Sequence, residues 1–169
     1  MSDPQVPLVS DKPVSLLDSK TILVLEDEPT VMKFMRHILK QYRVIEATTA
    51  QEALLLFIDY DHQVDLLLTD VTLPNLSGIQ VALLLRNTLP ELPVILTSGY
   101  PVDSWCIRDS ADLNRLGPLS VTIMQKPFQP DELSNAVRDL IGASASEPAT
   151  YPSDERRQPG RVLRLPRTA

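Results

Sequence analysis

The sequence contains very little cysteine and histidine. Among its 169 residues there are one cysteine, Cys106, and two histidines, His37 and His62. A single cysteine excludes an internal disulfide and a zinc site built from cysteines, and two histidines give no basis for a histidine-rich metal site. We interpret Cys106 as a small, semi-buried apolar residue in preference to a catalytic thiol.

Long apolar runs and an excess of positive charge are also missing. No run approaches the roughly 20 apolar residues of a membrane-spanning helix, and the N-terminus lacks the basic and apolar regions of a signal peptide. The formal net charge of -6 argues against broad electrostatic binding to nucleic acid or to anionic membranes. We therefore expect a cytoplasmic protein with no membrane partner.

The 15 prolines concentrate near the ends of the chain and suggest its division. Residues 1–19 read as a flexible leader, 20–142 as one folded domain, and 143–169 as a disordered tail rich in Pro and Arg. From Arg156 onward the tail has five arginines and no acid; a solvated tail is favoured over a docking motif. Because the tail lacks amphipathic helices, we expect no DNA-binding domain and a stand-alone protein.

Apolar strand-like runs alternate with helical patterns in the central region. Short runs rich in apolar residues indicate strands at Thr21–Leu25, Arg43–Ala47, Asp65–Thr69, Pro93–Thr97 and Ser120–Met124. Apolar residues at helical spacing predict helices with the stripes Val31–Phe34–Met35–Ile38–Leu39 and Ala50–Ala53–Leu54–Phe57–Ile58, and further helices over 79–88 and 130–141. Tandem βα units predict an α/β fold with a doubly wound parallel sheet and helices on both faces.

Polar residues follow the strands where ligands bind in such a sheet, beyond the carboxyl ends. They are Glu26, Asp27 and Glu28 after the first strand, Asp70 after the third, Thr97, Ser98 and Gly99 after the fourth, and Gln125, Lys126 and Pro127 after the fifth. Grouped carboxylates stay ionised only beside a cation, and oxygen ligands favour Mg²⁺. A carboxylate beside Mg²⁺ and a lysine is suited to phosphoryl transfer through an aspartyl phosphate.

Four segments resemble, in order, the signature blocks of receiver domains in two-component signalling: LVLEDEPTV, DLLLTDVTLPNLSG, PVILTSGY and QKPF. The resemblance implies a flavodoxin-like sheet of five strands in the order 2-1-3-4-5. It also implies a response regulator that takes a phosphoryl group from a sensor histidine kinase or phosphotransfer protein in a Mg²⁺-dependent reaction. Such a protein signals through protein contacts and is no enzyme beyond its own phosphorylation and dephosphorylation.

The resemblance also assigns roles to individual residues. Asp70 matches the phosphoacceptor, Ser98 the hydroxyl that binds the phosphoryl group, and Lys126 the lysine that binds it from the other side. The metal ligands implied are Glu26, Asp27, Asp70 and the backbone carbonyl of Thr72. Lys126–Pro127 is expected to be a cis peptide bond, and Thr97 is expected to point away from the site.

Three features depart from the family pattern. The first acidic position is Glu26 where Asp is more frequent, and its longer side chain is expected to alter the affinity for the metal without abolishing it. Ile123 stands where the family has an aromatic residue that moves on phosphorylation. The segment between Ser98 and Lys126 is long and has a poor helical stripe, so its helix is expected to be short, shifted or mobile. Trp105 and Leu113 in this segment could form an exposed partner patch, although packing onto the core is favoured for each.

Two alternatives from other functional classes remain. One is a phosphorylation-independent interaction module that keeps the receiver fold, favoured by Ile123 and by the unusual segment. The other is a phosphatase of the haloacid dehalogenase type, which needs a second aspartate two residues after the nucleophile. That position is Thr72, so the phosphatase is the weaker alternative.

Overall fold

The computed structural model describes residues 19–118, 120–142 and 163–164. The predicted domain 20–142 is described almost throughout. The predicted leader and tail lie outside the described residues, apart from Ser19, Leu163 and Arg164. No helix in these described ranges is long and apolar enough to cross a membrane.

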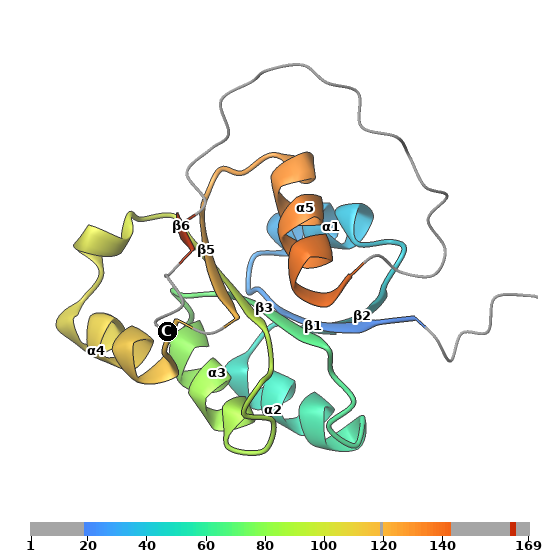
Figure 1. Cartoon of the computed structure of the whole chain (residues 1–169), viewed down its shortest axis with the longest axis horizontal. Helices are drawn as coiled ribbons and strands as arrows, with labels where there is room; N and C mark the ends of the chain where they lie inside the picture. The colour runs from blue at the N-terminus through green and yellow to red at the C-terminus, as the bar shows by residue number, and fades with distance from the viewer. Residues whose placement is uncertain (1–18, 119, 143–162, 165–169) are drawn as a thin grey trace, which may run out of the picture.

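The described strands form one sheet in the order β2-β1-β3-β4-β5-β6 (Figure 1). The first five are parallel, which confirms the predicted order 2-1-3-4-5. Their bounds are β1 Thr21–Leu25, β2 Arg43–Ala47, β3 Leu66–Asp70, β4 Val94–Ser98 and β5 Val121–Gln125.

Strands β3, β4 and β5 start and end one residue later than predicted. Asp65 lies before β3 because its carboxylate accepts a hydrogen bond from the Thr21 N–H at 2.8 Å and pairs with Lys20 at 2.9 Å. Pro93 has no N–H for a ladder, and Ser120 has a positive φ of 56°. The later ends make Asp70 and Ser98 the last residues of their strands.

The sixth strand, β6 Leu163–Arg164, was not predicted and adds to the five-stranded sheet expected. It pairs antiparallel with β5, Leu163 opposite Ile123 and Arg164 opposite Thr122. Two residues are too short for a periodic pattern, so the sequence offers no signal for this strand.

Helices cover both faces of the sheet (Figure 1). On one face α1 and α5 pack over Ile22 and Val24; on the other, α2, α3 and α4 pack over Leu23 and Leu25. This division follows from the alternation of side chains along a strand. The helices are α1 Pro29–Ile38, α2 Ala50–Asp59, α3 Gly78–Arg86, α4 Ile107–Leu116 and α5 Pro130–Ile141, with a short 3₁₀ helix, η2 Val102–Ser104.

The α4 segment is a regular ten-residue helix, as long as α1 and α2, so the expectation of a short helix was wrong, although the helix contains few apolar residues. Leu113 and Leu116 are buried in the core, and the buried Asp112 accepts a hydrogen bond from Gln80 Nε2 of α3 at 3.2 Å. Arg115 pairs with the other oxygen of Asp112 at 3.0 Å. Polar contacts to α3 therefore hold α4 in place where apolar residues are few.

Predictions about four single side chains are settled by burial. Leu113 and Trp105 both pack onto the core, as favoured. Ile58 is 60% exposed, so the predicted apolar stripe of α2 was wrong at that residue. The interpretation of Cys106 was also wrong, because this residue is exposed at the start of α4, where its Sγ accepts the Asp109 N–H at 3.4 Å.

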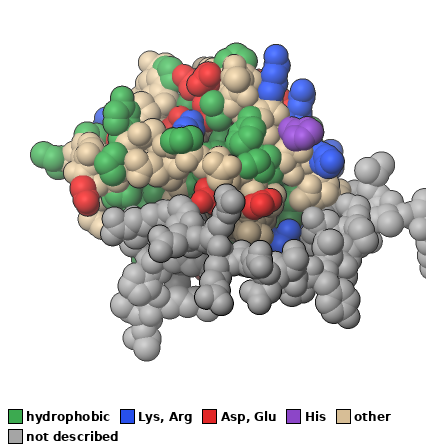
Figure 2. Space-filling model, turned by 90° about the horizontal axis from the view of Figure 1, so that it is seen from above, with side chains coloured by type: hydrophobic (Ala, Val, Ile, Leu, Met, Phe, Trp, Pro, Cys, Tyr) green, Lys and Arg blue, Asp and Glu red, His purple; other side chains and the backbone are tan. Residues whose placement is uncertain are grey.

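Charged side chains are unevenly distributed over the surface. Seen from the side of α1 and α5, Lys, Arg and a His gather at one edge of the visible surface (Figure 2). Residues 29–42, which include α1, hold Lys33, Arg36, His37 and Lys40 and no acid. This basic segment directly follows the acidic run 26–28, so opposite charges adjoin where β1 ends.

The start of α2 is held by three hydrogen bonds among Thr48, Thr49 and Glu52. Thr49 Oγ1 accepts the Glu52 N–H at 3.1 Å. The Glu52 carboxylate in turn accepts the Thr48 N–H at 2.7 Å and the Thr48 hydroxyl at 2.9 Å. These hydrogen bonds hold the pKa of Glu52 below its ordinary value, because they favour the ionised carboxylate.

Glu52→Gln is expected to lower the free energy of unfolding at neutral pH by about 0.5–1 kcal/mol, since a capping charge near a helix N-terminus is lost. Because the pKa of Glu52 is lower in the folded state than in the unfolded state, the ionised carboxylate stabilises the fold. This stabilisation is present above the unfolded pKa of 4.5 and is lost as the pH falls through the folded pKa. The difference from wild type should therefore shrink between neutral pH and about pH 3 in urea titrations. The exposed Glu91→Gln, which caps no helix, is the control; an equal loss there would contradict the assignment.

Candidate functional site

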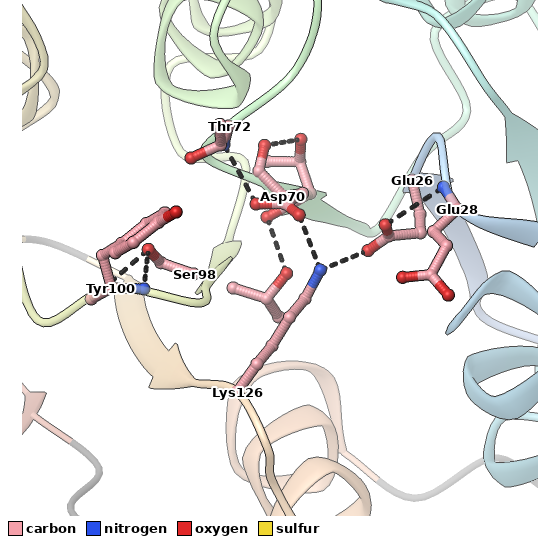
Figure 3. A network of polar contacts seen from close by, with 9 residues as sticks. Glu26, Glu28, Asp70, Thr72, Ser98, Tyr100 and Lys126 are labelled. Atoms are coloured by element: carbon pink, nitrogen blue, oxygen red, sulfur yellow. Dashed lines mark hydrogen bonds and ion pairs between the residues drawn. The ribbon is translucent and has the colours of Figure 1, made fainter. Parts of the chain in front are cut away.

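Asp70 ends β3 and is 8% exposed. Its Oδ1 accepts the Thr72 N–H at 2.9 Å, which fixes the carboxylate against the turn after the strand. Its Oδ2 lies 2.6 Å from Lys126 Nζ. One carboxylate oxygen is thus held by backbone and the other by an ammonium group (Figure 3).

Lys126 follows β5 and bridges two carboxylates. Its Nζ donates to Asp70 and, at 2.7 Å, to Glu26 Oε2 (Figure 3). Burial lowers the pKa of Lys126, but hydrogen bonds and charges of Asp70 and Glu26 outweigh burial, so its pKa is raised overall. The ammonium group therefore stays charged and joins the ends of β1, β3 and β5.

Glu26 follows β1 and is 1% exposed. Its Oε1 accepts the Glu28 N–H at 3.3 Å, while Oε2 binds Lys126. Burial raises the pKa of Glu26 above its ordinary value, and the contact with Lys126 opposes only part of this rise. The buried carboxylate is thus incompletely compensated by the groups around it.

Asp27 completes an acidic cluster with Glu26 and Asp70. Each residue offers one carboxylate oxygen, and these atoms all lie within 4.8 Å of one another. Three ionised carboxylates with one ammonium leave an excess of two negative charges, which one divalent cation neutralises. Oxygen-only ligands suit a hard cation such as Mg²⁺, so the donor set fits the metal predicted from the sequence.

The structure brings together Glu26, Asp27, Asp70 and Lys126 as the sequence predicted. The Lys126–Pro127 peptide bond is cis, also as predicted. The Thr97 hydroxyl donates to the Thr69 carbonyl at 3.4 Å and takes no part in the cluster. At Thr72 the recorded contact is made by its N–H, and the predicted role of its carbonyl stays a prediction.

Comparison with known families now adds to this geometry. The sequence profile of the family described as "Response regulator receiver domain" matches residues 22–138.

The chain belongs to the response regulator receiver family.

Relatives of this receiver domain occur in both regulators and kinases. It is 36% identical over 118 residues to "Response regulator GtcR" of Aneurinibacillus migulanus, covering 68% of this chain and 44% of the relative. It is 31% identical over 133 residues to "Sensor kinase CckA" of Brucella abortus, covering 78% of this chain and 13% of that one. The chain therefore spans less than half the length of either curated relative.

A solved structure supports the same fold. A response regulator receiver domain protein from Clostridium thermocellum superimposes with a TM-score of 0.61 at 27% identity, covering 72% of this chain and 94% of that chain. The likeness thus extends over nearly all of that receiver domain.

Ser98 ends β4 beside the acidic cluster but is turned toward Tyr100 (Figure 3). Its hydroxyl donates to the Tyr100 carbonyl at 2.9 Å and accepts the Tyr100 N–H at 3.1 Å. Sequence analysis identified Ser98 and missed these contacts, because the partner is backbone and no side-chain pattern reports it. The Ser98 hydroxyl has one proton, so it cannot donate to another acceptor while it holds the Tyr100 carbonyl.

The close packing around Gly78 explains why the turn after Asp70 ends in glycine. A Cβ built at Gly78 would lie well inside van der Waals contact with the Asp70 carbonyl oxygen and with Thr69 Oγ1. The Gly78 N–H also donates to the Val71 carbonyl at 3.2 Å. The first turn of α3 can therefore approach the end of β3 only without a side chain at this position.

Gly78→Ala is expected to destabilise the fold by about 3 kcal/mol, since the added methyl group must displace backbone that carries Asp70. Urea unfolding measures the loss. Gly99→Ala is the matched control, because a Cβ at Gly99 has no atom within 4 Å. Equal stabilities of the two variants would refute the close-approach explanation.

Glu26→Gln is expected to stabilise the metal-free domain at neutral pH by about 1 kcal/mol, because it removes a buried and incompletely compensated charge. Because the pKa of Glu26 is higher in the folded state than in the unfolded state, the protonated carboxyl favours the fold. This contribution of Glu26 to stability is full below the unfolded pKa of 4.5 and is lost as the pH rises through the folded pKa. The gain should therefore vanish at acid pH and should shrink when Mg²⁺ is added at neutral pH. Urea titrations in EDTA and in Mg²⁺ measure both effects.

The control for this variant is Glu28→Gln, which changes the neighbouring exposed carboxylate. A Glu26→Gln domain that is less stable than wild type in EDTA at neutral pH would contradict the prediction.

Proposed function

We propose that this receiver domain accepts a phosphoryl group on Asp70 from the phosphohistidine of a sensor histidine kinase or phosphotransfer protein. The observation that carries the proposal is the Asp70 carboxylate, held 2.6 Å from Lys126 within a cluster of three carboxylates. The phosphorylated domain signals through contacts with another protein, and it works in the cytoplasm.

In the transfer, an oxygen of Asp70 forms a bond to phosphorus as the bond from phosphorus to the donor imidazole nitrogen breaks. The donor reacts with its other ring nitrogen protonated, so when the bonding electron pair stays on the nitrogen released from phosphorus, the imidazole leaves as the neutral ring. Lys126, already beside Asp70 Oδ2, neutralises negative charge on the phosphoryl oxygens. In the later hydrolysis, a water oxygen forms a bond to phosphorus as the bond from phosphorus to the Asp70 oxygen breaks. The protons of the water leave with inorganic phosphate, and the Asp70 carboxylate is restored.

Glu26, Asp27, Asp70 and the Thr72 carbonyl would hold Mg²⁺ in this reaction. The bound cation supplies further neutralisation of phosphoryl charge during transfer. The clustering of three carboxylate oxygens within 4.8 Å supports this assignment. We propose no turnover of other substrates, so the activity is limited to the domain's own phosphorylation and dephosphorylation.

A phosphorylation-independent interaction module is the second candidate. Two observations favour it: Ile123 is buried in place of an aromatic residue, and the Ser98 hydroxyl is held by the Tyr100 backbone. Equal affinity of a partner for the phosphorylated and unphosphorylated domain would support this candidate over the first.

Incubation with acetyl phosphate and Mg²⁺ is expected to add one phosphoryl group, seen by intact mass, and Asp70→Asn should abolish it. EDTA should prevent the reaction, because the carboxylate cluster then repels the incoming anion. Asp27→Asn should slow it by about tenfold or more, since a metal ligand is lost.

The matched control is Asp59→Asn, an exposed acid at the end of α2. It should be phosphorylated at the wild-type rate. The absence of an adduct on wild type, or an undiminished adduct on Asp70→Asn, is incompatible with the proposed function.

A further inference from the structure

The carbonyl of Tyr100 accepts hydrogen bonds from two side chains. One donor is the Ser98 hydroxyl at 2.9 Å, and the other is Trp105 Nε1 at 3.2 Å. Tyr100 lies between them in the segment that leaves β4, and its own side chain is 64% exposed. A single backbone oxygen thus connects the end of β4 with the tryptophan that follows η2.

The Ser98 hydroxyl cannot serve two acceptors at once, because it has one proton. If it donates to a phosphoryl oxygen on Asp70, it ceases to donate to the Tyr100 carbonyl. The indole N–H of Trp105 is then the remaining side-chain donor that the structure gives to this carbonyl. Trp105 therefore reduces the free-energy cost of turning Ser98 toward the site.

Trp105 is itself anchored on the core. It is half-buried and packs against the cluster that contains Leu113 of α4 and Ile123 of β5. Its backbone N–H donates to the Val102 carbonyl at 3.1 Å, which closes η2. The indole donor is thus held in a fixed place, two residues before α4 begins at Ile107.

We propose that Trp105 is a positioning residue for Ser98. It holds the Tyr100 carbonyl when the Ser98 hydroxyl moves to the phosphoryl group, and it carries that change to the start of α4. The proposal rests on the proposed phosphorylation of Asp70 and adds a residue that the family pattern does not assign. It also supplies an aromatic side chain in a chain that has Ile123 at the family's aromatic position.

The first test observes the indole N–H directly. Trp105 is the single tryptophan of the chain, so a ¹⁵N–¹H spectrum holds one indole resonance. Addition of Mg²⁺ and beryllofluoride, an analogue of the phosphoryl group, should move this resonance downfield, because the indole loses its competitor at the Tyr100 carbonyl. Ser98→Ala without the analogue should move it in the same direction.

The second test is a double-mutant cycle on affinity for beryllofluoride with Mg²⁺. Trp105→Phe keeps an aromatic ring on the core and removes the N–H donor. It should weaken binding about two- to tenfold, corresponding to one hydrogen bond. In a Ser98→Ala background the same substitution should have no effect, because no hydroxyl competes there; a merely structural role for Trp105 would weaken both backgrounds equally.

The outcomes separate this inference from the proposed function. If acetyl phosphate modifies Asp70 but the indole resonance stays in place, or Trp105→Phe binds the analogue as wild type does, the role of Trp105 is refuted and the function stands. If wild type neither binds the analogue nor forms the adduct, the function fails, and the role of Trp105 fails with it. The indole measurement uses wild-type protein, so it decides the matter even if Trp105→Phe fails to fold.

Discussion

The ammonium group of Lys126 is the interaction on which the site depends. Three carboxylates crowd at the carboxyl edge of the sheet, and two of them, on Glu26 and Asp70, are buried. Without a cation between them, their desolvation and mutual repulsion would oppose folding of this edge. Lys126 Nζ lies 2.7 Å from Glu26 and 2.6 Å from Asp70, and so connects the segment after β5 with the ends of β1 and β3. The negative charge that it leaves uncompensated makes the edge suited to a divalent cation.

The topology makes this arrangement possible. In the order 2-1-3-4-5 the strands that carry Glu26, Asp70, Ser98 and Lys126 are neighbours, so residues distant in sequence meet at one edge. Glycine at position 78 then lets α3 begin directly against the Asp70 carbonyl. Asp70 is thus fixed by a strand on one side and a helix start on the other. Rigid backbone on both sides holds its carboxylate beside the ammonium group of Lys126.

The sequence sufficed for the parallel sheet and for the cluster because both rest on strong local signals, whereas the strand order was implied by the resemblance to receiver domains. Buried strands are continuous apolar runs, and the charged residues stand directly after them, so parallel topology alone brings Asp27, Asp70 and Lys126 together. Prediction from the sequence failed where tertiary contacts determine the burial of a side chain or the position of a helix. Ile58 fits a helical stripe yet lies outside the packed face, and α4 is placed by Asp112 and Gln80, which no apolar period reveals. The bonds of Ser98 with the Tyr100 backbone and the pairing of β6 with β5 involve main-chain atoms, which leave no side-chain pattern in the sequence.

Burial of Ile123 limits how a change at the site can reach the rest of the domain. Its side chain is 6% exposed, and its backbone lies opposite Leu163 of β6, so the middle of β5 is packed on one face and paired along its edge. The α4 region is different, because its connections to the site are polar and replaceable. Gln80, which caps α3 just after Gly78, donates to Asp112 of α4, and the Tyr100 carbonyl links Ser98 with Trp105 before α4. Hydrogen bonds of this kind can exchange partners without opening the core, whereas displacing Ile123 would leave a cavity. The segment between β4 and α4 can therefore rearrange at lower free-energy cost than the middle of β5.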